Sequence, residues 1–302
     1  MSLEISIEEF DINQFGQLSE LFGSYFKPGD KLLDRAYTQW LYGQNPFGSA
    51  RMVIAAEAGR WVGSMAMVPA HLVKQGEQVV AYYVVNVLVH PEFHGKHVFG
   101  RLITAAKEQV KTENAVLMGH PNDMAIKSWQ RAKMHFVEPL KAGLAVPRLR
   151  PRGVEVVEVT HIDQLLPVWP ALKAQALEAD HWGLAATGEY IAWRYLAHPA
   201  NQYRIQRVDV AGTSAGFMVT KKVRPGVSLL VDQFLVDRHA RAALACLPWL
   251  TVSFRPQAVL RELSGAIWTL PIKKQLPFFF TKFQQPVGAA DVMYLGLSTS
   301  DF

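Results

Sequence analysis

The stretch that decides the fold reads Val85-Asn-Val-Leu-Val-His90-Pro-Glu-Phe-His94-Gly-Lys-His-Val-Phe-Gly100-Arg-Leu-Ile103. It begins as an apolar, β-rich strand, passes through a loop that contains Gly95, and continues with apolar residues at helical spacing from Val98. Such a loop presents backbone N–H groups at a helix N-terminus, where unpaired donors and the helix dipole favour an anion. The stretch therefore predicts a strand, an anion-binding loop and a helix, in outline a cradle for a pyrophosphate.

Hydrophobic periodicity predicts further elements on both sides of this stretch. The expected elements are helices at 14–26, 32–42 and about 98–111, a hairpin of strands 52–58 and 62–68, strands at 79–89 and 115–118, and a helix that Asn122 caps. The run 79–89 is apolar on both faces, which indicates a central strand. This order predicts an α+β fold, a mixed and mostly antiparallel twisted sheet flanked by helices.

The sequence also repeats itself at a distance of 153 positions. Nine positions correspond without a gap: Tyr37 and Tyr190, Trp40 and Trp193, Tyr42 and Tyr195, Asn45 and His198, Pro46 and Pro199, Arg51 and Arg204, Gly59 and Gly212, Gly63 and Gly216, Met65 and Met218. A unit of this length indicates a duplicated domain. We expect tandem domains at 1–147 and 153–302, with the repeated tyrosines and tryptophans as core residues of each copy.

Composition limits the class of protein. The chain has 302 residues, of which 50% are apolar and 19% charged, as in a well-packed globular protein. Cys246 is the one cysteine, which excludes a disulfide framework and predicts a reducing, cytoplasmic location. No signal peptide is visible, and the longest apolar run, Val79 to Val89, is too short to span a membrane.

The formal net charge of +5 points to an anionic partner. The basic residues are scattered, so we expect a small phosphorylated ligand and no nucleic acid. His90, His94 and His97 have no carboxylate or cysteine at ligand spacing, so no metal site is expected. We expect a monomer or homodimer.

The strand, loop and helix resemble the signature of the GCN5-related N-acetyltransferase (GNAT) superfamily. Val89, Pro91, Phe93, Gly95, Val98, Phe99 and Leu102 match its register, and Asn122, Ala125 and Trp129 resemble a later motif whose asparagine meets the cofactor. The resemblance implies acetyl-CoA as cofactor. The implied cofactor-binding residues are Val87, Leu88, Val89, His94, Gly95, Lys96, His97, Val98, Phe99, Gly100, Asn122 and Trp129.

The sequence departs from the family pattern at positions that matter for chemistry. The second loop glycine is His97, whose Cβ resists a positive φ. Tyr83 and Val85 stand where many relatives place a base, and Trp129 replaces the tyrosine that protonates the leaving thiolate. Asp232, in the strand-like run 228–236, is our candidate for the catalytic base.

The second copy lacks the loop. Its counterpart runs from Val236 to Cys246 with fewer residues and no glycine. We therefore expect one cofactor site, in copy one, and a degenerate GNAT-like copy two that shapes the substrate pocket or serves as scaffold.

The resemblance implies direct transfer of an acetyl group from acetyl-CoA to the amine of a small molecule, with strand N–H groups near 87–89 polarising the carbonyl. A catalytically inactive GNAT-fold binding or regulatory protein is the alternative. Transfer of a longer acyl or an aminoacyl group is a third possibility, which differs in the length of the pocket.

Overall fold

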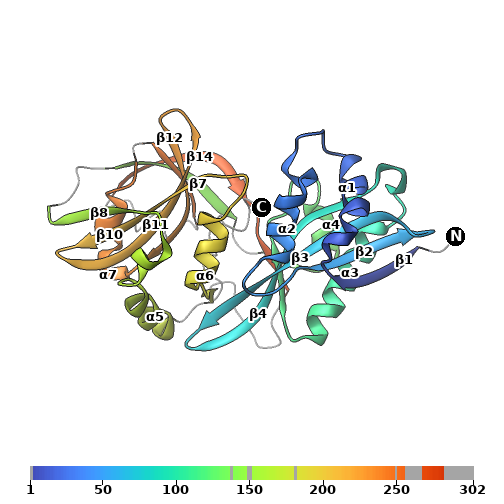
Figure 1. Cartoon of the computed structure of the whole chain (residues 1–302), viewed down its shortest axis with the longest axis horizontal. Helices are drawn as coiled ribbons and strands as arrows, with labels where there is room; N and C mark the ends of the chain where they lie inside the picture. The colour runs from blue at the N-terminus through green and yellow to red at the C-terminus, as the bar shows by residue number, and fades with distance from the viewer. Residues whose placement is uncertain are drawn as a thin grey trace.

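The computed structural model describes residues 3–136, 139–147, 152–179, 182–248, 250–255 and 267–281. It shows two sheets side by side, each flanked by helices (Figure 1). Both sheets are mostly antiparallel, with one parallel pair of strands each. The α+β fold and the tandem arrangement expected from the sequence are confirmed.

The first half of the chain supplies most of the first sheet. Its elements are β1(Glu4–Glu9), η1(Ile12–Gln14), α1(Phe15–Gly23), η2(Lys31–Leu33), α2(Arg35–Gly43), β2(Arg51–Glu57), β3(Arg60–Lys74), β4(Glu77–Val89), η3(Pro91–Phe93), α3(Val98–Thr112), β5(Val116–Gly119), α4(Ile126–Arg131), β6(His135–Phe136) and β7(Leu140–Pro147). The α3 helix forms because Val98, Leu102 and Ile103 begin an apolar stripe that is buried against the sheet. The sequence did not predict β1, which pairs with β2 at the sheet edge.

The second half repeats this order. Its elements are β8(Val154–Val159), η4(Ile162–Leu165), α5(Trp169–Glu178), β9(Gly183–Leu184), α6(Gly188–Ile191), η5(Ala192–Leu196), β10(Tyr203–Val210), β11(Thr213–Arg224), β12(Val227–Leu235), α7(Asp237–Leu244), β13(Thr251–Arg255), β14(Ile267–Leu276) and β15(Phe279–Phe280). The short β9 strand pairs with β3 of the first sheet. Apart from β9 in the second half and η2 and η3 in the first, the order from β8 to β13 follows that from β1 to β5, with α6 and η5 in the place of α2. Residues 148–151 lie outside the described part.

The two sheets exchange their last strands. The first sheet runs β1-β2-β3-β4-β5-β15-β6, and the second, read from its β8 edge, runs β8-β10-β11-β12-β13-β7-β14. In each sheet the place next to β5 or β13 is filled by a strand from the other half, β15 in the first sheet and β7 in the second. Each sheet is therefore completed by the other copy.

The repeated aromatic residues are buried, as expected, and they also meet across the boundary between the copies. Trp40 and Trp193 stack with ring centroids 5.0 Å apart. The indole N–H of each donates to the backbone carbonyl of the other, at 3.0 Å in both directions. The two copies thus face each other through the same residues, an approximate twofold relation like that of an isologous dimer interface.

Candidate functional site

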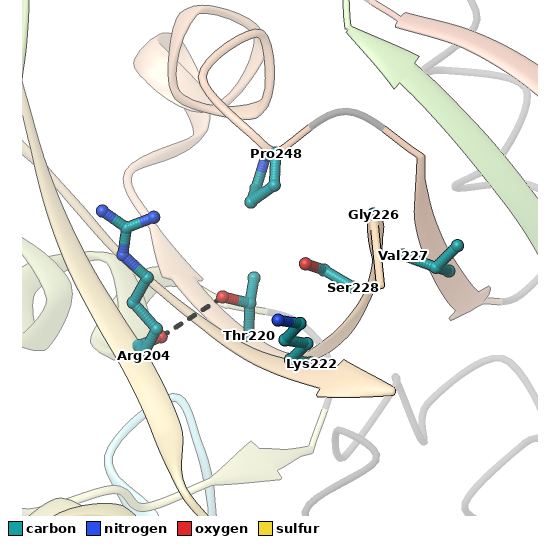
Figure 2. A pocket seen from close by; sticks show the side chains of 7 residues that line it. All are labelled: Arg204, Thr220, Lys222, Gly226, Val227, Ser228 and Pro248. Atoms are coloured by element: carbon teal, nitrogen blue, oxygen red, sulfur yellow. Dashed lines mark hydrogen bonds between the residues drawn. The ribbon is translucent and has the colours of Figure 1, made fainter. Parts of the chain in front are cut away.

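An open depression of about 380 Å³ lies in the second sheet, between the β11–β12 hairpin and the segment before β13 (Figure 2). It is lined by Arg204, Thr220, Lys222, Gly226, Val227, Ser228 and Pro248. The Arg204 guanidinium is already paired with the Glu158 carboxylate at 2.9 Å. None of the residues expected to bind a cofactor lines this depression, because they gather around β4 of the first sheet.

In the first sheet, β4 and β5 separate beyond a short parallel pairing. Residues 81–83 pair with 116–118, and β4 then continues to Val89 with β3 alone on its other side. A bulge interrupts that ladder, because Asn86 and Val87 both lie opposite Met65. Asn86 has a φ of 51°, and its amide donates to the Tyr42 hydroxyl at 2.7 Å. The bulge bends β4 at the point where the strand is no longer paired with β5.

The loop after β4 adopts the conformation that a phosphate cradle needs. Gly95 has a φ of 78° and His97 a φ of 60°. His97 therefore occupies the left-handed region despite its Cβ, at a cost on the order of 1 kcal/mol. Histidine is among the non-glycine residues enriched there. His97 thus adopts the left-handed conformation that the family pattern assigns to a glycine.

The loop and the first turn of α3 carry a row of unpaired backbone donors. Within the described chain, no acceptor faces the N–H groups of Gly95, His97, Val98, Phe99 and Gly100. A Cβ added to Gly95 would meet no atom within 4 Å, so the space in front of the loop is open. Five free donors at a helix N-terminus favour a bound anion. The Lys96 ammonium lies 4.2 Å from the centre of the Phe93 ring, at the base of the same loop.

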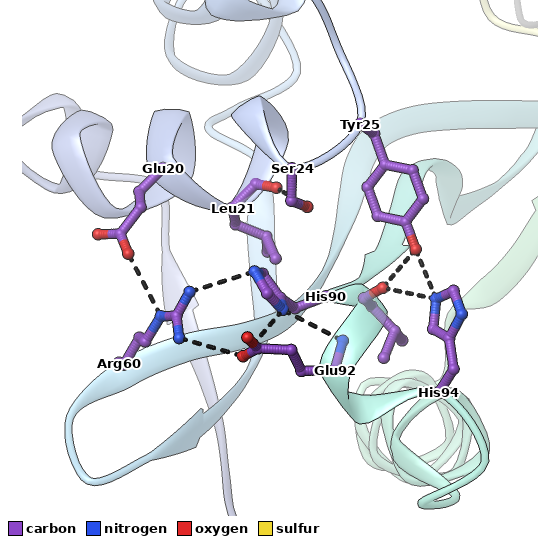
Figure 3. A network of polar contacts seen from close by, with 9 residues as sticks. Glu20, Leu21, Ser24, Tyr25, Arg60, His90, Glu92 and His94 are labelled. Carbon is purple, nitrogen blue, oxygen red and sulfur yellow. Dashed lines mark hydrogen bonds and ion pairs between the residues drawn. The ribbon is translucent and has the colours of Figure 1, made fainter.

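Two side chains meet at the last carbonyl of β4 (Figure 3). The Tyr25 hydroxyl, just after α1, donates to the Val89 carbonyl oxygen at 2.6 Å. His94 Nε2 lies 2.5 Å from the tyrosine oxygen and 3.0 Å from the same carbonyl. Burial raises the pKa of Tyr25, so its hydroxyl stays protonated and able to donate. These contacts join α1 to the loop across the end of the strand.

A second network fixes the start of the loop (Figure 3). The Arg60 guanidinium contacts the carboxylates of Glu20 at 3.3 Å and Glu92 at 3.5 Å, and it donates to His90 Nε2 at 3.1 Å. The Arg60, Glu20 and Glu92 side chains are about half to two-thirds exposed, so each ion pair contributes less than about 1 kcal/mol. Their joint effect is to hold the turn at Pro91 against the β2–β3 hairpin.

The later motif lies beside the exchanged strand. The Asn122 side chain accepts from the Ala125 N–H at 2.9 Å, so it caps the turn that leads into α4. Trp129 is 2% exposed, stacks on Phe279 at 4.2 Å, and meets Phe99 edge to face at 5.8 Å. The structure shows Trp129 as a packing residue between α3 and β15; a contact with a cofactor stays a prediction.

Asp232, the base expected from the sequence, lies inside the second copy. Its carboxylate accepts from the Tyr195 hydroxyl at 2.8 Å and from the Gln233 N–H at 2.9 Å. Burial and the neighbouring carboxylate raise the pKa of Tyr195 far above its usual value, so the tyrosine remains a donor. These contacts describe a structural role on β12, and a catalytic role for Asp232 stays a prediction.

His120 is a residue that the sequence analysis did not select. It follows β5 directly, and its Nδ1 lies 3.0 Å from the carbonyl oxygen of Pro277, in the segment that leads to β15. Its ring packs 5.0 Å from the Phe278 ring. Burial lowers the pKa of His120 to about 4, against the opposing effect of the Pro277 carbonyl. Only the fold brings these residues together, because 157 positions separate them.

No three side chains of His, Cys, Asp or Glu in the described part of the chain lie close enough to hold a metal ion. Among the described helices, none has the length and apolar character needed to cross a membrane.

The comparisons with known proteins agree with this fold. The acetyltransferase (GNAT) domain family matches residues 6–127. A conserved protein of unknown function from Enterococcus faecalis V583, described as a probable N-acyltransferase, aligns with a TM-score of 0.69 and 10% identity over 93% of this chain and 73% of its own. A GCN5-related N-acetyltransferase from Anabaena variabilis ATCC 29413 aligns with a TM-score of 0.67 and 12% identity over 92% and 72%.

A third structure shares the duplicated architecture. A tandem GNAT protein from the clavulanic acid biosynthesis pathway aligns with a TM-score of 0.58 and 13% identity, over 95% of this chain and all of its own. A search of curated protein sequences gave no match. The chain thus has the fold of tandem GNAT proteins. Within it, residues 6–127 are the segment that matches the acetyltransferase (GNAT) domain family.

Proposed function

We propose that this protein is an acetyl-CoA-dependent N-acyltransferase that acts on the amine of a small molecule, with one cofactor site in the first copy. The observation that carries the proposal is the row of five unpaired N–H groups from Gly95 to Gly100, next to the free edge of β4. This pairing of an anion cradle with an open strand edge fits two adjacent parts of coenzyme A, the diphosphate and the amide-bearing pantetheine chain.

The residues present can hold each part of that molecule. The N–H groups of the loop and of the first α3 turn would bind the diphosphate oxygens. The open edge of β4 from Val87 to Val89, whose last carbonyl already accepts from Tyr25, would pair through its other backbone groups with the amide groups of the pantetheine chain and direct an N–H toward the thioester carbonyl. Acetyl-CoA would then supply an activated acyl group for attack by the amine.

The protein's own contribution to the rate is positioning and polarisation. A strand N–H aimed at the developing oxyanion needs no reorganisation during the reaction and contributes about 3 kcal/mol in comparable sites. Holding the amine against the carbonyl contributes by removing the cost of bringing the reactants together. The location in the cytoplasm and the monomeric or dimeric state stay predictions.

Calorimetric titration with acetyl-CoA tests the proposal. We expect micromolar binding by the wild type and a loss of at least about 30-fold in Gly95→Pro, because proline removes an N–H and cannot adopt the φ of 78° found there. Gly226→Pro is the matched control, since Gly226 is an exposed turn glycine of the second copy with a φ of 73°. Circular dichroism of both variants checks the fold.

Each outcome separates the functional classes. Binding that Gly95→Pro alone abolishes supports the proposed site. No binding of acetyl-CoA by the folded wild type overturns the proposal. Binding without transfer to any amine would instead favour a binding or regulatory protein that keeps the fold.

A further inference from the structure

Tyr83 and Val85 stand on β4 where the resemblance implies a base, and neither is a base at neutral pH, but an imidazole lies opposite that position. In the parallel register, Tyr83 lies opposite Met118. If this register is continued by two residues on each strand, Val85 of β4 comes opposite His120, which follows β5. His120 thus lies beside the bulge at Asn86, where the two strands separate.

The alternation of side chains places His120 on the face of the sheet that α1 and α2 cover. Met118, Tyr83 and Val85 belong to the core cluster that includes these helices, whereas Leu117 belongs to the cluster under α3. His120 is two residues after Met118, so it points to the same side. Its ring contact Phe278 is a member of the same cluster. The imidazole therefore lies on the face opposite α3.

The hydrogen bond to Pro277 fixes the tautomer of His120. A carbonyl oxygen only accepts, so Nδ1 of the ring must carry the proton. In the neutral ring Nε2 then keeps its lone pair. Within the described residues Nε2 has no hydrogen-bond partner, and the side chain is half-buried. The ring is thus oriented by one nitrogen and open at the other, as in other sites where a histidine takes up a proton.

We propose, on the basis of the proposed function, that His120 Nε2 accepts the proton of the attacking amine, and that the Pro277 carbonyl is the group that positions the ring. As the new bond between the amine nitrogen and the acyl carbon forms, the nitrogen gains positive charge and gives its proton to Nε2. The carbon–sulfur bond breaks, and the sulfur leaves with its electron pair. His120 returns the proton to that sulfur, so the products are an amide and a thiol.

The lowered pKa of His120 fits this role. The ring is neutral at pH 7, which leaves the lone pair available before the attack. An imidazole with this pKa cannot take a proton from a free ammonium group, but it can accept one from a nitrogen that becomes strongly acidic as it bonds to carbon. His120 thus acts during bond formation, and the amine must enter uncharged.

The position of Nε2 can be tested without turnover, by modifying histidines with diethyl pyrocarbonate and mapping the products by mass spectrometry. Acetyl-CoA should protect His94, His97 and His120 from modification by at least about 5-fold. Adenosine 3′-phosphate 5′-diphosphate, which represents the nucleotide end of coenzyme A, should protect His94 and His97 but leave His120 reactive. The exposed His161 of the second copy serves as internal reference. If acetyl-CoA protects the loop but not His120, the proposal is wrong.

Activity provides the second readout. Wild-type protein is screened with acetyl-CoA against glucosamine, spermidine and phenethylamine, and the amine with the highest rate is used. His120→Asn keeps a donor for the Pro277 carbonyl and removes Nε2. It should lower kcat about 100- to 1000-fold and change the KM for acetyl-CoA less than about 2-fold. His71→Asn is the control, since His71 is a half-buried histidine on β3 whose Nδ1 faces Gln78 at 2.7 Å.

The outcomes distinguish the two proposals. If the wild type binds no acetyl-CoA, the proposed function fails. If the wild type transfers acetyl groups and folded His120→Asn keeps its kcat within about 3-fold, the function stands and the role of His120 is rejected. If none of the three amines reacts, the footprint alone decides, because it reports whether Nε2 lies at the acetyl end of the bound molecule.

Discussion

The junctions between the central strand and the following helix differ between the two copies. In copy one, eight residues from His90 to His97 separate β4 from α3, and a bulge of Asn86 and Val87 precedes them. In copy two, Val236 alone separates β12 from α7. Gln233 alone lies opposite Met218, and the β11–β12 ladder has its bulge further from the strand end, at Val231 between Asp232 and Leu230. The second copy therefore lacks the long loop, and its bulge lies further from the strand end than the bulge of copy one.

The framework around these junctions is shared in detail. Ala58 and Ala211 both have a positive φ in the hairpin turn, at 52° and 49°. The bulge after Ala55 in β2 recurs after Val208 in β10, 153 positions later. What the copies share therefore builds the sheet, and what only copy one has builds the loop. The comparison separates the residues that stabilise the fold from those that serve the site.

The largest expected effect concerns a glycine pair of the shared framework. A Cβ on Gly216 would lie 2.1 Å from the Phe234 carbonyl oxygen, and its φ is 123°. A Cβ on the corresponding Gly63 would lie 2.9 Å from Val98 Cγ1, a side-chain atom. We expect Gly216→Ala to lower the free energy of unfolding by about 3–5 kcal/mol and Gly63→Ala by about 1–2 kcal/mol.

Urea unfolding of both variants measures this difference. The control is Gly23→Ala, where a Cβ meets no atom within 4 Å. If Gly63→Ala and Gly216→Ala lower the free energy of unfolding equally, the two sheets accommodate an added Cβ equally well. The predicted difference between the two glycines would then be wrong.

Much of the first copy could be predicted from its sequence, and the relation between the copies could not. The strand at 79–89, the loop at Gly95 and the α3 stripe follow from local patterns that the structure repeats. Strand β1 was missed because Ile5 and Ile7 give only two alternations. The exchange of β7 and β15 has no local signal, since either strand could complete either sheet.

In the candidate site, too, the residues in local motifs could be predicted and those that depend on the other half of the chain could not. The loop and Asn122 lie within continuous motifs, so their types and spacing were visible. His120 was not, because its orientation depends on Pro277 and Phe278 from the other half of the chain. A residue whose role depends on a partner so distant in sequence can be recognised only once the strand exchange is known.

The next effect concerns the stability cost of His120. Its folded pKa is about 4, below the value near 6.5 of an unfolded histidine. Between these values the unfolded chain binds a proton that the folded chain does not, so acid destabilises the wild type. His120→Asn lacks this site, and its stability relative to the wild type should therefore improve as pH falls from 7 to 4.5.

We expect that improvement to reach about 1–2 kcal/mol, since partial exposure of the ring reduces the full effect. Urea unfolding of wild type and His120→Asn at pH 7, 6, 5 and 4.5 measures it, with His161→Asn as the exposed control. If the difference in the free energy of unfolding between the two proteins stays constant across this range, the His120 ring is solvated like an ordinary histidine. Its burial would then not destabilise the folded protein in acid.

The smallest effect concerns His97, which has no counterpart in copy two. Its φ of 60° favours glycine, so His97→Gly should relieve backbone strain. Glycine also increases the entropy of the unfolded chain, and the two effects nearly cancel, which leaves a gain of at most about 1 kcal/mol. The N–H that faces the open loop is retained, so the affinity for acetyl-CoA should change less than about 3-fold. Calorimetry together with thermal unfolding measures both quantities. A large loss of affinity would mean that the imidazole itself contacts the phosphates, and the loop would then depend on its side chains as well as on its backbone.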